Sequence, residues 1–220
     1  MGEGVDRGSV DSLYPVFIDV KEKRCVFVGA GRVGERKIRG VLEGGGQNLL
    51  VVSPVATERV RAWAEESHLE WRACAYGPED LDGATLVFAA TGSSKVNAKV
   101  VSDARERGIL VNGADRHTRG DFMGASTLRR GDFQIAISSG GSSPAYVRLL
   151  REILDGALGH EHETFARFLG ELRPRVHKRF PDDIRKRESV WKELVSHEVL
   201  GLAREGRWDR IEIMVDTCLS

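Results

Sequence analysis

Residues 25–37, CVFVGAGRVGERK, join an apolar run to a charged, helix-forming segment through a turn with three glycines. Gly29, Gly31 and Gly34 have the G-x-G-x-x-G spacing of a dinucleotide-binding βαβ unit. In such a unit the first glycine makes the tight turn, the second lets the backbone approach a pyrophosphate, and the third lets the helix pack on the strand. The motif alone is weak, because a ligand-free strand-to-helix turn can show the same pattern, so its context must decide.

The context favours a dinucleotide site, because β-rich runs alternate with helical stretches as in a parallel sheet with crossover helices. We expect strands at 24–30, 48–53, 69–76, 84–92 and 109–115, and helices at 32–43, 58–67 and 94–108. The pattern then changes: 122–139 predicts a hairpin that turns at Arg-Arg-Gly-Asp, and an amphipathic helix with Pro144 in its first turn follows. The expected fold is an α/β Rossmann-like domain over 13–115, a hairpin-plus-helix segment over 116–158 and a helical part over 159–220.

Composition excludes several classes of function. Lys+Arg and Asp+Glu are both 33, so the chain lacks the basic excess of a nucleic-acid-binding protein and we expect no nucleic-acid partner. No apolar run approaches the roughly 20 residues of a membrane-spanning helix, so we expect no membrane partner. Cys25, Cys74 and Cys218 form no C-x-x-C pair and fit a reducing cytoplasm. Residues 1–12 are polar and glycine-rich, and we interpret them as a disordered leader.

The cofactor-binding residues are expected where the first, second and fourth strands end. The helix that follows the glycine turn offers free N–H groups and a positive dipole end to phosphate. The second strand ends in VVSP, where the ribose-binding acid of many such sites is absent; Ser53 can form a hydrogen bond, and Arg59 either meets a 2′-phosphate or is solvated. NAD and NADP both remain open on these residues. The candidates are Gly29, Gly31, Arg32, Val33, Gly34, Ser53, Pro54, Val55 and Thr91.

Several blocks of the sequence, in this order, resemble one family. They are YPVFIDVKEKRCVFVGAGRVGERK, VVSP, DLDGATLVFAATGSSKVN, VNGAD, and LRRGDFQIAISSGGSSP leading into RLLREIL. Over about residues 14–158 the chain is similar to precorrin-2 dehydrogenase, the module type found at the N-terminus of sirohaem synthase. Residues 160–220 match the helical part of these proteins more loosely.

The resemblance implies an activity. The substrate would be precorrin-2, a reduced tetrapyrrole with eight carboxylates, and NAD would accept a hydride as sirohydrochlorin forms. Some members then insert ferrous iron. The family's VVSP block also lacks the ribose acid, which favours NAD, and the family is homodimeric, with 116–158 expected as the dimerisation segment. Two alternatives are a dehydrogenase without chelatase activity and a domain that senses NAD without turnover.

The resemblance also assigns a key aspartate to Asp115 in VNGAD, although the family more often has bulky apolar residues where this chain has Gly113 and Ala114. A carboxylate at the carboxyl edge of a sheet suits proton removal, and it could also meet an incoming iron ion transiently. A loop aspartate that makes an Asx-turn is the alternative. Candidate substrate-binding residues are Asn112, Arg116, His117, Ser139 and Gly140.

Each of these candidates has a plainer interpretation. Core-edge hydrogen bonding explains Asn97 and Asn112 equally well, and Arg116 and His117 could be solvated surface residues. The SSGGSSP loop could bind carboxylates through its N–H groups, or it could only supply a helix cap at Ser142 or Ser143. His160 and His162 alternate along a predicted helix, so we interpret them as a solvated helix start rather than a metal pair.

Overall fold

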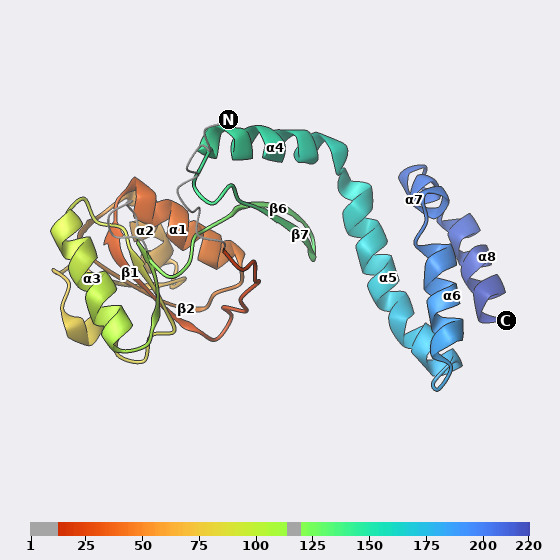
Figure 1. Cartoon of the computed structure of the whole chain (residues 1–220), viewed down its shortest axis with the longest axis horizontal. Coiled ribbons are helices and arrows are strands. Elements are labelled where there is room, and N and C mark those ends of the chain that lie inside the picture. The colour runs from red at the N-terminus through yellow and green to blue at the C-terminus, as the bar shows by residue number, and fades with distance from the viewer. Residues whose placement is uncertain (1–12, 114–119) are drawn as a thin grey trace, which may run out of the picture. The chain divides into compact units, whose positions relative to one another are not determined.

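The computed structural model describes residues 13–113 and 120–220 (Figure 1). The chain divides into two compact units, Met1–Gly124 and Ala125–Ser220. The expected division at 115/116 and 158/159 is finer than this and stays a prediction. Among the described helices, none combines the length and the apolar character needed to cross a membrane.

The first unit contains the predicted parallel sheet. Its strands stand in the order β3-β2-β1-β4-β5, and every neighbouring pair is parallel. This order puts β1 in the centre, and β1 is buried along nearly its whole length, as expected of a strand covered on both faces. The strands are β1 (Arg24–Ala30), β2 (Asn48–Ala56), β3 (Glu70–Arg72), β4 (Leu86–Ala89) and β5 (Leu110–Gly113).

Helices cover both faces of this sheet, and alternate residues of β1 point to opposite cores. Cys25 and Phe27 belong to the core that includes α1 and α2, whereas Val26 and Val28 belong to the core that includes α3 and a 3₁₀ helix. Thr57 caps α2 as predicted, accepting a hydrogen bond from the N–H of Val60 at 3.3 Å. The elements are α1 (Arg32–Glu43), α2 (Glu58–Glu65), η1 (Pro78–Leu81) and α3 (Ser94–Glu106).

Strand lengths differ from the sequence-based expectation at two places. β2 does not end before Pro54, because its ladder with β1 is irregular there: Ser53, Pro54 and Val55 together lie opposite one residue, Gly29. A proline is tolerated at such a bulge because no ladder hydrogen bond needs its nitrogen. β3 is much shorter than expected, since the N–H of Cys74 turns back to the carbonyl of Arg72 at 2.9 Å and ends the strand.

The second unit begins with the predicted antiparallel hairpin. The hairpin turns at Gly131, whose φ of +57° lies in the left-handed region that glycine adopts readily. Four of the helices that follow, α5 to α8, enclose two apolar clusters, centred on Leu172 and Leu194 and on Phe165 and Ile211. The elements are β6 (Ser126–Arg130), β7 (Phe133–Ile137), α4 (Pro144–Ala157), α5 (His160–Arg179), α6 (Ile184–Leu194), α7 (His197–Arg204) and α8 (Trp208–Leu219).

Candidate cofactor and active site

The absence of a side chain has a different structural consequence at each of the three glycines of the turn between β1 and α1. Gly29 has φ +102°, and a Cβ there would lie 2.5 Å from the carbonyl oxygen of Ala90. A Cβ on Gly34 would collide with the carbonyl oxygen of Gly29, so α1 packs on the turn only without a side chain. Gly31 is different, because its φ is ordinary and an added Cβ would meet no atom within 4 Å. The fold therefore requires Gly29 and Gly34, whereas Gly31 leaves open space beside the start of a helix.

That open space fits a phosphate group. Gly31 is the N-cap of α1 and has no side chain to hydrogen-bond with the N–H groups of the first turn, so these groups receive no cap from the N-cap residue. Such groups, with the positive end of the helix dipole, attract anions. The side chains of Arg32 and Val33 are exposed at the same helix start, next to the space that Gly31 leaves. The turn thus suits the pyrophosphate of a dinucleotide.

The bulge in β2 places the second group of cofactor candidates at the same edge of the sheet. Ser53 is only 8% exposed, and its hydroxyl donates to the carbonyl of Val55 at 2.8 Å. The carbonyl of Ser53 accepts a hydrogen bond from the indole of Trp71 at 3.0 Å, a contact that no local sequence pattern indicates. Pro54 and Val55 are exposed. The serine therefore shapes the bulge, and Pro54 and Val55 face outward.

A buried asparagine fixes the end of β4. Asn97 is 2% exposed; its side-chain oxygen accepts from the backbone N–H of Thr91 at 3.0 Å and from the Thr91 hydroxyl at 2.8 Å, and its amide nitrogen donates to the Thr91 carbonyl at 3.1 Å. Of the two interpretations of Asn97, core-edge hydrogen bonding is the one these contacts support. The following Gly92 is exposed, with open space where a Cβ would be.

At the end of β5 the structure reveals a residue that sequence reasoning missed. Lys37, on α1, donates a hydrogen bond to the side-chain oxygen of Asn112, and the Asn112 amide nitrogen donates to the carbonyl of Phe122 at 2.6 Å. Burial, and secondarily the neighbouring charge of Arg36, lower the pKa of the Lys37 ammonium. A lysine near the end of a glycine motif has no sequence signature of its own, because its partner is 75 residues away.

The predicted catalytic residue cannot be placed. Asp115, Arg116 and His117 lie outside the described residues, and their roles stay predictions. The chain beyond them is anchored to β5: the N–H of Asp121 donates to the carbonyl of Val111 at 2.6 Å, and the Asp121 carboxylate accepts from the N–H of Val111 at 3.1 Å.

The last two candidates, Ser139 and Gly140, belong to the second unit. The Ser139 hydroxyl accepts from the N–H of Ser143 at 3.0 Å, and the N–H of Gly140 donates to the hydroxyl of Ser138 at 3.1 Å. Of the two possible caps, it is Ser143 that caps α4, through the N–H of Tyr146. The hydroxyls of Ser138, Ser139 and Ser143 are thus engaged locally, and the roles of Ser139 and Gly140 in substrate binding stay predictions.

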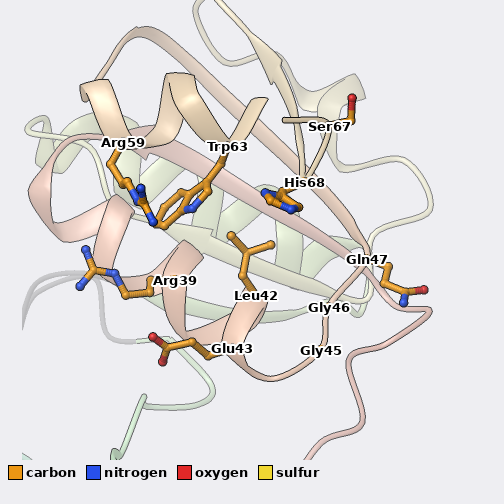
Figure 2. A pocket seen from close by; sticks show the side chains of 10 residues that line it. All are labelled: Arg39, Leu42, Glu43, Gly45, Gly46, Gln47, Arg59, Trp63, Ser67 and His68. Carbon is orange, nitrogen blue, oxygen red and sulfur yellow. The ribbon is translucent and has the colours of Figure 1, made fainter. Parts of the chain in front are cut away.

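The structure also contains a hollow of about 590 Å³ between α1 and α2 (Figure 2). Its lining includes the guanidinium groups of Arg39 and Arg59 and the rings of Trp63 and His68. The Arg59 guanidinium lies 5.3 Å from the centre of a Trp63 ring, and Arg39 pairs with Glu35 at 2.8 Å. Of the residues that the sequence analysis weighed for the cofactor, Arg59 belongs to this lining.

Metal-ligating side chains do not gather in the described part of the chain: no group of three or more His, Cys, Asp or Glu that could hold an ion occurs there. His160 and Glu163 are 3.8 Å apart at an exposed helix start, and Glu161 pairs with Arg204 at 3.0 Å. His160 is exposed, as the interpretation of a solvated helix start expects, but the side chain of His162 is only 18% exposed and lies 3.4 Å from the Arg204 guanidinium.

The fold and the glycine turn define a Rossmann-type nucleotide-binding protein, and comparison with known families makes this specific. Residues 16–126 match the family described as "Putative NAD(P)-binding", residues 130–157 match the central region of sirohaem biosynthesis proteins, and residues 163–219 match the sirohaem synthase dimerisation region. The chain therefore belongs to this NAD(P)-binding family and carries the sirohaem synthase regions in sequence after it. The family resemblance inferred from the sequence blocks is confirmed.

Individual relatives agree. The chain is 39% identical to siroheme synthase 1 of Aeromonas salmonicida over 189 residues, which are 86% of this chain and 40% of the relative. It is 34% identical to siroheme synthase 2 of Pectobacterium atrosepticum over 209 residues, which are 94% of this chain and 45% of the relative. The chain thus spans less than half the length of these relatives.

A solved structure titled SirC, precorrin-2 dehydrogenase, has a similar fold. Its TM-score is 0.73 at 25% identity, and the match covers 91% of this chain and 99% of that one. This likeness confirms the predicted fold class, a Rossmann-like sheet followed by a hairpin and helices.

Proposed function

We propose that this protein oxidises precorrin-2 to sirohydrochlorin with NAD as hydride acceptor, as the sequence resemblance implied. The observation that carries the proposal is the likeness to SirC, which extends over 99% of that dehydrogenase. The longer siroheme synthases are matched over less than half of their length, so they support the module and not the whole set of their activities.

In this proposal the glycine turn and the start of α1 hold the cofactor. The N–H groups that follow Gly31 bind its pyrophosphate, and Val55 and Gly92, both exposed, flank the path along the sheet edge. NAD is favoured over NADP by the family resemblance of the VVSP block, and the guanidinium of Arg59, the cation closest in sequence to that block, lies 5.3 Å from the centre of a Trp63 ring. Bound NAD supplies the electrophilic ring carbon that takes up the hydride.

The chemistry needs one further group from the protein. Precorrin-2 loses two hydrogens on oxidation, one as hydride to NAD and one as a proton. We assign the proton to Asp115, since an aspartate is ionised near neutral pH and can act as a general base. Arg116 and His117 follow it in sequence and would pair with the substrate's carboxylates.

The proposal is tested by mixing the purified protein anaerobically with precorrin-2 and NAD, and recording absorbance of NADH and of the oxidised macrocycle. We expect the two products in equal amounts. Asp115→Asn is expected to lower kcat about 100-fold or more while NAD binding is retained, whereas Asp82→Asn, which changes an exposed aspartate of the same unit, keeps wild-type turnover. NAD binding without either product would instead favour the sensor hypothesis.

Iron insertion is a separate question, which the same assay answers. Ferrous iron is added after the oxidation is complete, and the spectrum is followed for the metallated product. Metallation faster than in a protein-free sample would assign the chelatase step to this chain. Metallation at the protein-free rate leaves a dehydrogenase only.

We further propose that the protein is a homodimer in the cytoplasm. The match to a dimerisation region at residues 163–219 supports self-association. So does α4, whose Tyr146, Leu149 and Ile153 expose apolar surface along one side of the helix. The three unpaired cysteines agree with a reducing compartment. Light scattering should give about twice the chain mass of 24.3 kDa, and a value near 24.3 kDa would contradict the homodimer.

A further inference from the structure

A row of four residues crosses the centre of the sheet on the face that α1 covers. Val51, Phe27, Phe88 and Asn112 stand in register on β2, β1, β4 and β5. The first three are buried and apolar, and the rings of Phe27 and Phe88 stack with centroids 4.5 Å apart. The fourth is an amide that is only 4% exposed. A buried amide is unfavourable unless both of its ends are hydrogen-bonded, so its partners explain why it is there.

The two partners of Asn112 come from different parts of the first unit. Its oxygen accepts from the Lys37 ammonium of α1, six residues after Gly31, and its nitrogen donates to the carbonyl of Phe122 at 2.6 Å. A lysine can only donate and a carbonyl can only accept, so these contacts fix which end of the amide faces which partner. The Asn112 side chain therefore links α1, the proposed cofactor-binding helix, to the backbone at Phe122.

The contact between Lys37 and Asn112 requires partial burial of the Lys37 ammonium, which is energetically unfavourable. Its ammonium is half-buried, and in the described part of the chain no carboxylate pairs with it. Burial and the nearby Arg36 accordingly lower its pKa. The hydrogen bond to a neutral amide compensates only part of the desolvation of the ammonium, so this contact contributes little to folding stability. We therefore infer that the lysine has a role in the site.

Asp121 forms a second set of contacts between β5 and the segment at 120–122, which can be compared with those of Asn112. Asp121 holds the returning chain to the outer edge of β5 through both backbone groups of Val111, and its carboxylate also accepts from Arg105 at 3.0 Å. Asn112 holds the same chain from the face of the sheet, through Phe122, whose ring packs edge-on against Phe88 at 5.4 Å. Only the Asn112 anchor also reaches α1.

Resting on the proposed function, we propose that Lys37 is a positioning residue for the dehydrogenase: through Asn112 it fixes the carboxyl end of β5 and the returning Gly120–Phe122 chain relative to the cofactor helix. Asp115 stands between these two segments in the sequence. Lys37 therefore sets the geometry of the transfer step, whereas the glycine turn binds the cofactor.

Hydrogen–deuterium exchange of the cofactor-free protein tests the link without any substrate. In Lys37→Met we expect the amides of 110–113 and 120–124 to exchange about 10-fold faster, while those of β1 and α2 keep their wild-type rates. Lys99→Met is the matched control, because Lys99 is an exposed helical lysine that pairs with Asp103 on the opposite face of the sheet. Unchanged exchange in Lys37→Met would overturn the proposal.

Turnover then separates positioning from binding. We expect Lys37→Met to lower kcat about 10- to 100-fold, with KM and the NAD dissociation constant within about 3-fold of wild type, because small misplacement of reacting groups costs this much. Lys37→Arg, which keeps charge and donor, should recover most of kcat. A proportional loss of NAD affinity, or kcat equal to that of Lys99→Met, would overturn the proposal. A wild type without turnover refutes the proposed dehydrogenase but leaves the exchange result standing.

If Lys37→Met does not fold, hydrogen–deuterium exchange of Asn112→Asp tests the same link. It keeps an acceptor for Lys37 and removes the donor to Phe122, so faster exchange confined to 120–124 is expected. Wild-type exchange there would overturn the link.

Discussion

The sheet unit and the hairpin-and-helix unit bury their apolar residues in different ways. In the sheet unit, alternate residues of β1 enter two separate cores, so that both faces of the sheet are covered by helices of the same unit. In the second unit, α5 to α8 share two clusters, but none of the fourteen residues of α4 is buried. The faces of the sheet are therefore covered within their own unit, although Tyr14, Val16 and Phe17 before β1 are exposed, whereas α4 has an apolar side that its own unit leaves exposed.

This difference separates two tasks. A site that must hold a dinucleotide to within a fraction of an ångström needs a rigid scaffold, and the doubly covered sheet supplies one. An exposed apolar helix face is typical of a surface that meets another protein. The first unit thus provides the cofactor site, and the second has the features expected of self-association.

The largest expected effect compares truncations in the two regions. Phe27→Ala removes a fully buried ring from the stack with Phe88 and should lower the free energy of unfolding by about 3–5 kcal/mol. Ile153→Ala removes a side chain that is 57% exposed on α4 and should cost less than about 0.5 kcal/mol in the isolated chain. Urea denaturation at several protein concentrations measures both.

The concentration series also distinguishes packing of α4 within its own chain from packing of α4 against a second copy. A large cost of Ile153→Ala at every concentration would mean that α4 is packed within its own chain. A cost that appears only in self-associated samples would show that a second copy covers it.

The next effect is a dependence of stability on pH within the sheet unit. Burial raises the pKa of the Cys25 thiol to about 11. The unfolded thiol ionises near pH 9, so above that pH the unfolded chain releases a proton that the folded chain retains. The burial of the protonated thiol therefore makes its full contribution to the free energy of unfolding below about pH 9. As the pH rises from about 9 to about 11, the free energy of unfolding falls by about 2–3 kcal/mol.

Cys25→Ala isolates this contribution from other groups that titrate at alkaline pH. The stability difference between wild type and Cys25→Ala should shrink between pH 8 and 11, as measured by chemical denaturation at each pH. Parallel curves for the two proteins would show that Cys25 is not responsible.

The smallest expected effect compares two glycines on α1. A Cβ on Gly34 would meet the carbonyl of Gly29, so Gly34→Ala should destabilise the sheet unit by about 1–3 kcal/mol and weaken NAD binding. Gly40, on the same helix, has open space and an ordinary φ, so Gly40→Ala should stabilise by about 0.5–1 kcal/mol. Thermal unfolding and NAD titration of the two variants measure this contrast. Equal effects would mean that α1 does not pack closely on the turn.

Local signals in the sequence determined much of the fold. The bounds of β1 and α1 agree with the prediction, because a buried apolar run and a glycine turn act within a few residues. The Arg-Arg-Gly-Asp turn and the proline at the start of α4 were also predicted from neighbouring residues. In a parallel sheet, strand ends meet at one edge, so the sequence alone is enough to group Gly31, Ser53, Thr91 and Asn112.

Tertiary structure decided what depends on distant partners. The sequence could not show that Gly31 leaves open space while Gly34 is closely packed, since the difference arises from backbone atoms brought together by folding. It could not choose between the roles of Asn112, whose partners are Lys37, 75 residues away, and Phe122. Hydrogen bonds between buried polar groups are set by which elements pack together, and no local pattern encodes that. The sequence by itself therefore predicted which edge of the sheet the cofactor uses, and only the fold decided which side chains are hydrogen-bonded at that edge.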